Sequence, residues 1–334
     1  MTGAPPDGHE LGVRLREGDL SAAPAVLNLL ESRCAGAREQ TAVLLAAVSP
    51  ATLGAEAPAQ IVGVTGPPGV GKSSLLSRLL ARWRALDRSV AVLAVDPSSR
   101  RSGGSLLGDR ARIEFDPGDR AVFIRSSAAG DRLGGLAPAT RAGAAVLAAA
   151  FDVVVIETVG VGQSETDVAD VADTVAVVLQ PESGDALQFL KAGIMEVPDV
   201  LVLNKVDLGG VATRALADLR GALASLGARD TDVVAVSCAP PPSGIGELVE
   251  ALDAHRSTLE LPARRLRARR MHALSDFIVE YGERGLRALG GRRGAQRWLS
   301  EQPPGLDVIA LGRALAGRAD EGGRAAEPAQ AGPG

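Results

Sequence analysis

Cysteines and aromatic residues are scarce in this chain of 334 residues. Only Cys34 and Cys238 are present, far apart and without a CxxC pair or a histidine cluster, so the sequence suggests neither a disulfide framework nor a zinc site. Aromatic residues make up 2% of the chain, so Ala, Val and Leu must build the interior. The cysteine usage favours a reducing cytoplasm.

Long apolar runs and an excess of one charge are also lacking. No stretch of about 18 apolar residues occurs, and the N-terminus shows no charged region followed by an apolar one, so we expect a soluble, unexported protein. The formal net charge is −4, which gives no reason to expect nucleic acid or an anionic membrane as a partner.

Lysine is rare as well, because only Lys72, Lys191 and Lys205 stand among the 36 basic residues and the rest are arginines. A lysine retained in such a chain indicates a site that needs a compact ammonium rather than a planar guanidinium. Lys72 and Lys205 lie in the motifs described below. For Lys191 we favour a functional contact over an ordinary exposed position.

Short apolar runs rich in Val and Ile alternate with segments of helical periodicity in the middle of the chain. Such runs are typical of strands buried on both faces and joined by right-handed helical crossovers. We therefore predict an α/β fold with a mostly parallel central sheet flanked by helices, and functional sites at the carboxyl ends of the strands. The predicted strands are 61–65, 90–95, 121–124, 153–156, 175–179, 200–203 and 233–236, with helices at about 73–87, 137–150, 211–226 and 244–256.

Composition predicts four regions along the chain. Residues 1–58 form a helical N-terminal extension, and residues 59–260 form the α/β domain. Residues 261–316 are helical again and begin with an arginine-dense stretch at 264–270, which is either a solvated helix face or a subunit or partner contact. Residues 317–334, rich in Gly, Ala, Pro, Glu and Arg, are predicted to be a disordered tail.

The first chemical motif is GPPGVGKS, which directly follows a predicted strand and opens a predicted helix, as a Walker A loop requires. Its backbone amides and the helix N-terminus would surround the β-phosphate of a nucleotide. Lys72 would neutralise the β and γ oxygens, and the Ser73 hydroxyl would ligate Mg²⁺. The expected nucleotide contacts of this P-loop NTPase are Gly66, Pro67, Pro68, Gly69, Val70, Gly71, Lys72, Ser73 and Ser74.

The second motif is NKVD, which follows the predicted strand 200–203. The Asp207 carboxylate can accept hydrogen bonds from the N1–H and the exocyclic amino group of guanine, a pair of donors that adenine does not offer. Asn204 would brace the loop, and the Lys205 stem would lie along the base. Ser237, Cys238 and Ala239 follow the last predicted strand and fit either a backbone loop that reads the guanine carbonyl or a plain strand-end turn.

The third motif is ETVGVGQSE at the end of the predicted strand 153–156. Glu157 would reach a metal-bound water, and the Gly160 amide would sense the γ-phosphate. Gln163 either orients the attacking water or is a surface residue. We group Lys72, Asp109, Glu157 and Gln163 as the candidate catalytic residues.

Two further segments are candidate nucleotide-sensing loops. The Gly- and Ser-rich segment 96–110 places Asp96 at a strand end and Asp109 in a loop, where both can approach Mg²⁺ or its waters, although a loop carboxylate can also be merely solvated. The segment 180–199 leaves another predicted strand and contains Lys191.

These residues closely resemble the MeaB/ArgK family of P-loop GTPases, the chaperones of adenosylcobalamin-dependent acyl-CoA mutases. The resemblance spans about residues 10 to 310 and rests on VDPSS, GGSLLGDR, ETVGVGQSE, SGDALQFLKAGI and NKVD. It implies GTP or GDP with Mg²⁺ as ligands, with Lys72, Ser73, Asp96, Asp109 and Glu157 at the phosphates and metal. It places Asn204, Lys205 and Asp207 at the guanine, and segment 180–199 as a third switch that relays nucleotide state to the mutase.

The family also implies a homodimer formed through the C-terminal helices, and a role in gating cofactor delivery and protecting the mutase, either methylmalonyl-CoA mutase or a close relative. Pro24 departs from the family pattern, which prefers an uninterrupted helix there, and Val206 replaces a commoner Ala. Three alternatives stay open: a nickel metallochaperone GTPase, a kinase acting on transport components, and a binding switch that does not hydrolyse GTP.

Overall fold

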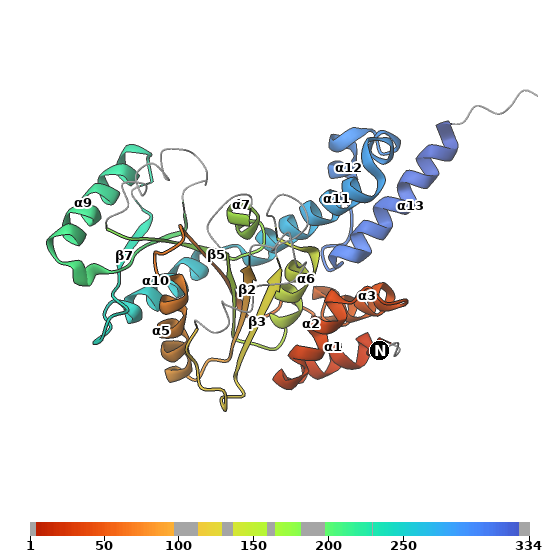
Figure 1. Ribbon diagram of the computed structural model, residues 1–334. Coiled ribbons are helices and arrows are strands. Elements are labelled where there is room, and N and C mark those ends of the chain that lie inside the picture. Colours follow the sequence, from red (N-terminus) through yellow and green to blue (C-terminus); the bar gives the residue numbers. More distant parts are fainter. Residues whose placement is uncertain are drawn as a thin grey trace, which may run out of the picture. The chain divides into compact units, whose positions relative to one another are not determined.

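The computed structural model describes residues 5–96, 113–128, 136–158, 164–181, 198–228 and 230–326 (Figure 1). The chain divides into two compact units. One consists of residues 14–31 and 58–259, and the other of residues 1–13, 32–57 and 260–334. Among the described helices, none combines the length and the apolar character needed to cross a membrane.

The first unit is built on a sheet of seven strands in the order β3-β2-β4-β1-β5-β6-β7. Every pairing between neighbours is parallel, which confirms the predicted α/β class. The strands are β1 (Gln60–Thr65), β2 (Val90–Asp96), β3 (Val122–Ala128), β4 (Val153–Glu157), β5 (Thr174–Leu179), β6 (Val200–Leu203) and β7 (Asp232–Ala235).

Helices cover both faces of this sheet, because alternate strand residues point to opposite sides. Val62 and Val64 face the core shared with α5 (Lys72–Ala85) and α10 (Ile245–Thr258), which lie side by side in Figure 1. Gly63 faces Val168 of α7 (Ser164–Ala169). The other helices among the described residues of this unit are η1 (Leu20–Ala22), α2 (Ala23–Glu31), α6 (Pro138–Leu147), η3 (Val206–Leu208) and α9 (Gly210–Ser225).

The helix α2 belongs to this unit rather than to a separate extension. A Cβ at Gly143 of α6 would stand 2.8 Å from Leu27 of α2, so the two helices are in close contact. Pro24 is the second residue of α2. Backbone N–H groups in the first turn of a helix have no acceptor within the helix, so proline costs no helical hydrogen bond here. The departure from the family pattern therefore does not interrupt the helix.

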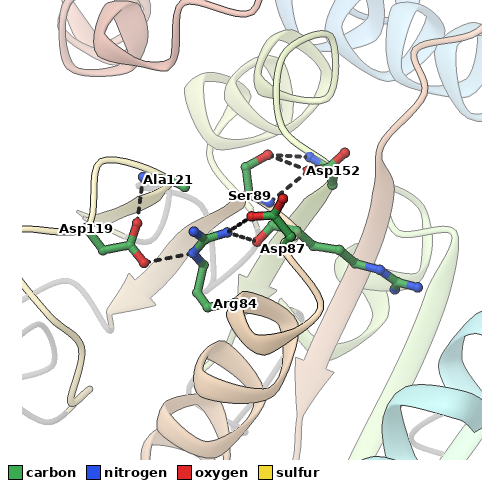
Figure 2. A network of polar contacts seen from close by, with 7 residues as sticks. Arg84, Asp87, Ser89, Asp119, Ala121 and Asp152 are labelled. Atoms are coloured by element: carbon green, nitrogen blue, oxygen red, sulfur yellow. Dashed lines mark hydrogen bonds and ion pairs between the residues drawn. The ribbon is translucent and has the colours of Figure 1, made fainter.

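Polar contacts fix the N-terminal ends of three strands, at the end of the sheet opposite the carboxyl ends of the strands (Figure 2). Asp152 accepts hydrogen bonds at Oδ2 from the Ser89 amide (2.8 Å) and hydroxyl (2.7 Å), which ties the start of β4 to that of β2. Asp119 accepts from Arg84 Nε at 2.7 Å and from the Ala121 amide at 2.9 Å, just before β3. These two bonds hold the pKa of the Asp119 carboxyl below its usual value of 3.8, the bond from Arg84 contributing most.

The second unit is helical and consists of the first part of α1 (Gly8–Arg16), α3 (Ala37–Ala47), α4 (Pro50–Leu53), α11 (Leu261–Ala288), α12 (Gly291–Ser300) and α13 (Val308–Ala326). Its core joins Phe277 of α11, Leu299 of α12 and Leu315 of α13. Residues 317–326 are helical, in contrast to the predicted disordered tail. Leu311, Leu315 and Ala319 are buried on one face, and this packing carries the helix beyond the point where composition alone predicts its end.

The arginine-dense stretch 264–270 makes contacts within its own unit. Arg265 donates to the Ala57 carbonyl at 2.6 Å, and Arg269 forms a two-pronged pair with Glu56, both contacts at 2.8 Å. Arg270 donates to the carbonyls of Ser300 and Gln302 at 3.0 and 3.1 Å. Three of these arginines thus anchor α11 to other segments of its own unit. The sequence had suggested either a solvated helix face or a subunit or partner contact, and neither of these includes such anchoring.

Candidate nucleotide site

The loop between β1 and α5 has the backbone conformation of a phosphate cradle. Gly66 and Gly71 have φ values of 143° and 92°, a region that favours glycine. A Cβ at Gly66 would stand 2.1 Å from the Val178 carbonyl oxygen, and one at Gly71 would stand 2.6 Å from Asn204 Nδ2. The fold therefore requires glycine at both positions of the predicted Walker A loop.

Positive charge is concentrated at this loop. Lys72 is 8% exposed, and its Nζ donates to the carbonyls of Gly66 (2.6 Å) and Pro67 (3.1 Å). The same residue begins α5, a helix of 14 residues whose N-terminal amides carry a partial positive charge. An ammonium and a helix N-terminus at one glycine-rich loop form a site for an anion such as a phosphate group.

Oxygen donors lie beside the cradle, at the carboxyl end of β4. Glu157 is 6% exposed, and its Oε1 accepts a hydrogen bond from Ser73 Oγ at 3.4 Å. A hydroxyl next to a buried carboxylate is a hard oxygen pair of the kind that Mg²⁺ prefers, so the residues present fit this metal. The backbone of Asp96 ends the neighbouring strand β2, and its side chain lies outside the described part of the structure.

Asn204 connects the second motif to the phosphate loop across 134 positions of sequence. Its Nδ2 donates to the Val70 carbonyl at 2.8 Å, and both residues are 1% exposed. Lys205 has a left-handed backbone, with φ at 62°. Its Nζ donates to the Gly69 carbonyl at 2.9 Å and to Gln180 Oε1 at 2.6 Å. The Walker A and NKVD segments therefore form a single site.

The loop after β7 completes this side of the site. Ser237 donates from Oγ to Asp207 Oδ1 at 2.6 Å, which orients a carboxylate that is exposed. Cys238 donates from Sγ to Asn204 Oδ1 at 3.5 Å, and Ala239 donates from its amide to Ser237 Oγ at 3.2 Å. Burial raises the pKa of the Cys238 thiol, so the sulfur keeps the proton that it donates.

Residues 23–283 match the model of the family described as methylmalonyl Co-A mutase-associated GTPase MeaB. The chain belongs to this family. The family resemblance predicted from the sequence motifs is thereby confirmed, and the chain is a GTPase.

Individual relatives agree with the family assignment. A relative in Pyrococcus abyssi that is named as a GTPase is 42% identical over 268 residues, covering 78% of this chain and 80% of its own. The methylmalonic aciduria type A homolog of Caenorhabditis elegans, described as mitochondrial, is 39% identical over 211 residues, 60% of this chain and 53% of its own. A solved structure of a LAO/AO transport system kinase has a TM-score of 0.61 and 28% identity, covering 88% of this chain and 96% of its own.

Several residues of the predicted MeaB site are brought together and others lie outside the described residues. The Walker A residues, Glu157, the NKVD residues and the loop 237–239 line one end of the sheet. Asp109, Gly160, Gln163 and Lys191 belong to segments that the structure does not describe.

The structure also adds residues that the motifs did not indicate. Thr158 donates from Oγ1 to Thr65 Oγ1 at 2.9 Å, and both are fully buried, so the residue after Glu157 is held to β1. Ser77 donates to the Ser73 carbonyl at 3.0 Å and accepts from the Glu114 amide at 2.8 Å. Arg78 contacts Cys238 in the loop after β7, and Gln180 contacts Lys205 of the second motif. Their positions on α5 and at the end of β5 are the only sequence signal that could have singled them out.

Proposed function

We propose that this MeaB-family GTPase binds GTP and GDP with Mg²⁺ at the carboxyl ends of β1, β4 and β6. The observation that supports this most strongly is the pair of bonds from Asn204 and Lys205 to the carbonyls of Val70 and Gly69. These bonds put a base-reading carboxylate, Asp207, on the same rigid frame as the phosphate loop. The assignments of the site residues are part of this proposal.

The loop amides and Lys72 would bind the phosphates. On binding, the Lys72 ammonium would leave the loop carbonyls that it now contacts and would contact the β and γ phosphate oxygens instead. Ser73 and Glu157 are the described residues that would hold Mg²⁺, whose chemistry when bound is to neutralise charge on those oxygens. Catalysis is then positional and electrostatic, without a covalent intermediate. We expect slow intrinsic hydrolysis that a partner accelerates by ordering the nucleotide-sensing loops.

Base selection belongs to Asp207, because its carboxylate accepts hydrogen bonds from the N1–H and the 2-amino group of guanine, and adenine offers no such pair of donors. Calorimetric titration with GDP and ADP tests the assignment. Tighter binding of GDP is the expected result, and equal affinity for the two nucleotides would remove the guanine site from the proposal.

We further propose that the client is an adenosylcobalamin-dependent acyl-CoA mutase, methylmalonyl-CoA mutase or a close relative. The family description and the name of the nematode homolog support this. The protein would gate cofactor loading and protect the mutase, acting as a homodimer in the cytoplasm. Co-purification with a mutase, and mutase activity retained over many turnovers only when protein and GTP are both present, are the expected results. A mutase whose inactivation is unaffected would contradict the client assignment.

The sequence alternatives gain less support. A nickel metallochaperone would need Cys or His ligands near the nucleotide-sensing loops. His255 instead contacts Thr174 at 2.9 Å and Asp199 at 3.3 Å, at the N-terminal ends of the strands and opposite the phosphate loop. Within the described residues, no group of three or more His, Cys, Asp or Glu side chains is arranged to hold a metal ion. Labelled GTP incubated with candidate proteins distinguishes a kinase, and a phosphate-release assay distinguishes a pure binding switch.

A further inference from the structure

The loop 237–239 follows β7, a strand at the side of the sheet. Among the described strands β7 pairs only with β6, and its four residues are exposed or only partly buried. Ser237 and Ser243 exchange two backbone hydrogen bonds of 3.0 Å, which close the loop on itself. These bonds do not connect the loop to the phosphate cradle.

Arg78 supplies a connection from α5, the helix that begins at Lys72, in addition to the one through Asn204. Its Nε donates to the Cys238 carbonyl at 3.2 Å, and its side chain is partly buried. Cys238 contacts Asn204, and Asn204 contacts Val70 in the phosphate loop. These contacts form a closed series. Arg78 of α5 contacts Cys238, Cys238 contacts Asn204, and Asn204 contacts the phosphate loop that leads into the start of α5.

The Cys238 amide is available as a hydrogen-bond donor. Within the described part of the chain, the Cys238 amide donates to no acceptor. The amide and the carbonyl belong to the two peptide groups that meet at the Cys238 Cα, so a bond that holds the carbonyl limits how far this Cα and its amide can move. An N–H held in this way at the guanine side of the site can donate to a purine 6-oxo group.

We propose that Arg78 is a positioning residue that determines specificity for 6-oxopurines, by holding the Cys238 carbonyl and with it the amide that reads the base. The inference rests on the proposed guanine site and on the expectation from the sequence that the loop 237–239 reads the guanine carbonyl. It adds the residue that positions this second reader. Asp207 recognises the N1 proton and the 2-amino group, whereas the loop that Arg78 holds recognises the 6-oxo group. Adenine carries an amino group at this position, which cannot accept the bond.

Three nucleotides separate the two readers. GDP has the 6-oxo group, the N1 proton and the 2-amino group, IDP lacks only the 2-amino group, and ADP has none of the three. In Arg78→Met, which keeps the aliphatic stem and removes the donor, we expect GDP and IDP to bind about three- to tenfold more weakly, the range for one hydrogen bond. ADP should bind as before. The ratio of GDP to ADP affinity then falls, while the ratio of GDP to IDP affinity is unchanged.

The matched control is Arg82→Met, on the same helix but with an exposed side chain, which should leave all three affinities unchanged. Arg78→Lys keeps a donor on a flexible stem and should retain more of the GDP-to-ADP ratio than the Met variant. Competition against a fluorescent GDP analogue measures all affinities, and a thermal melt checks that each variant is folded.

The outcomes separate this inference from the function on which it rests. A wild-type protein without preference for GDP over ADP removes the guanine site altogether. A wild-type preference that survives intact in Arg78→Met overturns the role of Arg78 alone. Equal weakening of GDP, IDP and ADP also overturns it, because general damage to the pocket would not depend on the 6-oxo group. A Lys variant as weak as the Met variant would contradict the hydrogen bond.

Discussion

Replacing Asn204 with alanine removes the bond that joins the base motif to the phosphate loop. Asn204 donates from Nδ2 to the Val70 carbonyl at 2.8 Å, and both residues are 1% exposed. Water is therefore a poor substitute for the missing donor unless the loop rearranges. The same substitution deprives the Cys238 thiol of its acceptor.

The size of the effect follows from the burial of the orphaned group. A buried carbonyl that loses its donor costs about 1–3 kcal/mol, which is roughly 5- to 150-fold in an equilibrium constant. If the loop keeps its shape, this cost lowers the free energy of unfolding without nucleotide. If the loop moves to reach water, the loss appears as weaker GDP binding. We expect the two losses together to fall in this range.

Urea unfolding without nucleotide and calorimetric titration with GDP measure the two parts. The chain offers one matched control, since Asn28 is its only other asparagine and is exposed on α2. Asn28→Ala should change both quantities by less than about 0.5 kcal/mol. An Asn204→Ala protein with wild-type stability and wild-type GDP affinity would refute the connection between the two motifs.

Three further substitutions test other parts of the site and the fold. Lys72→Ala should abolish GTP turnover in a phosphate-release assay, because the loop then lacks its ammonium; a fully active variant contradicts the phosphate role. Asp207→Ala should remove the preference for GDP over IDP in competition binding, and an unchanged preference would assign the 2-amino group to another residue. Asp119→Asn should destabilise the protein near neutral pH in urea unfolding. The difference from wild type should shrink as the pH falls below the ordinary Asp119 pKa of 3.8, because the stabilisation from a carboxylate with a lowered folded pKa is complete above its unfolded pKa and is lost as the pH falls through the folded one. A difference independent of pH would exclude the ion pair with Arg84 as its cause.

Most strands were predictable because a strand buried on both faces must be apolar along its whole length. The prediction for 200–203 matches β6, and the other central strands differ by a residue or so at their ends. β3 is the exception, since the apolar run predicts 121–124 and the strand continues to Ala128. Arg125, Ser126 and Ser127 pair with β2 at the edge of the sheet, where polar side chains are tolerated.

The residues of the site that stand in short motifs of known chemistry were predictable from the sequence. The residues that reach the site only through packing were not. Lys72 and Asp207 stand in short patterns with a fixed chemical meaning, so sequence reasoning found them. Arg78 contacts Cys238 across 160 positions, and this contact depends on how α5 lies against the last strand. Neither periodicity nor composition contains that information. The family resemblance indicated the site but could not supply this contact.

The interleaving of the two units has a practical consequence for anyone who wishes to produce the GTPase part alone. A fragment cut at residue 58 would lose α2, and with it Leu27 and Leu30, which lie beside Gly143 of α6. The face of α6 that they cover would then be bare apolar surface, prone to aggregation. A working fragment has to carry residues 14–31 as well, either within a continuous fragment 14–259 that keeps the intervening residues 32–57 or in a rerouted chain that omits them.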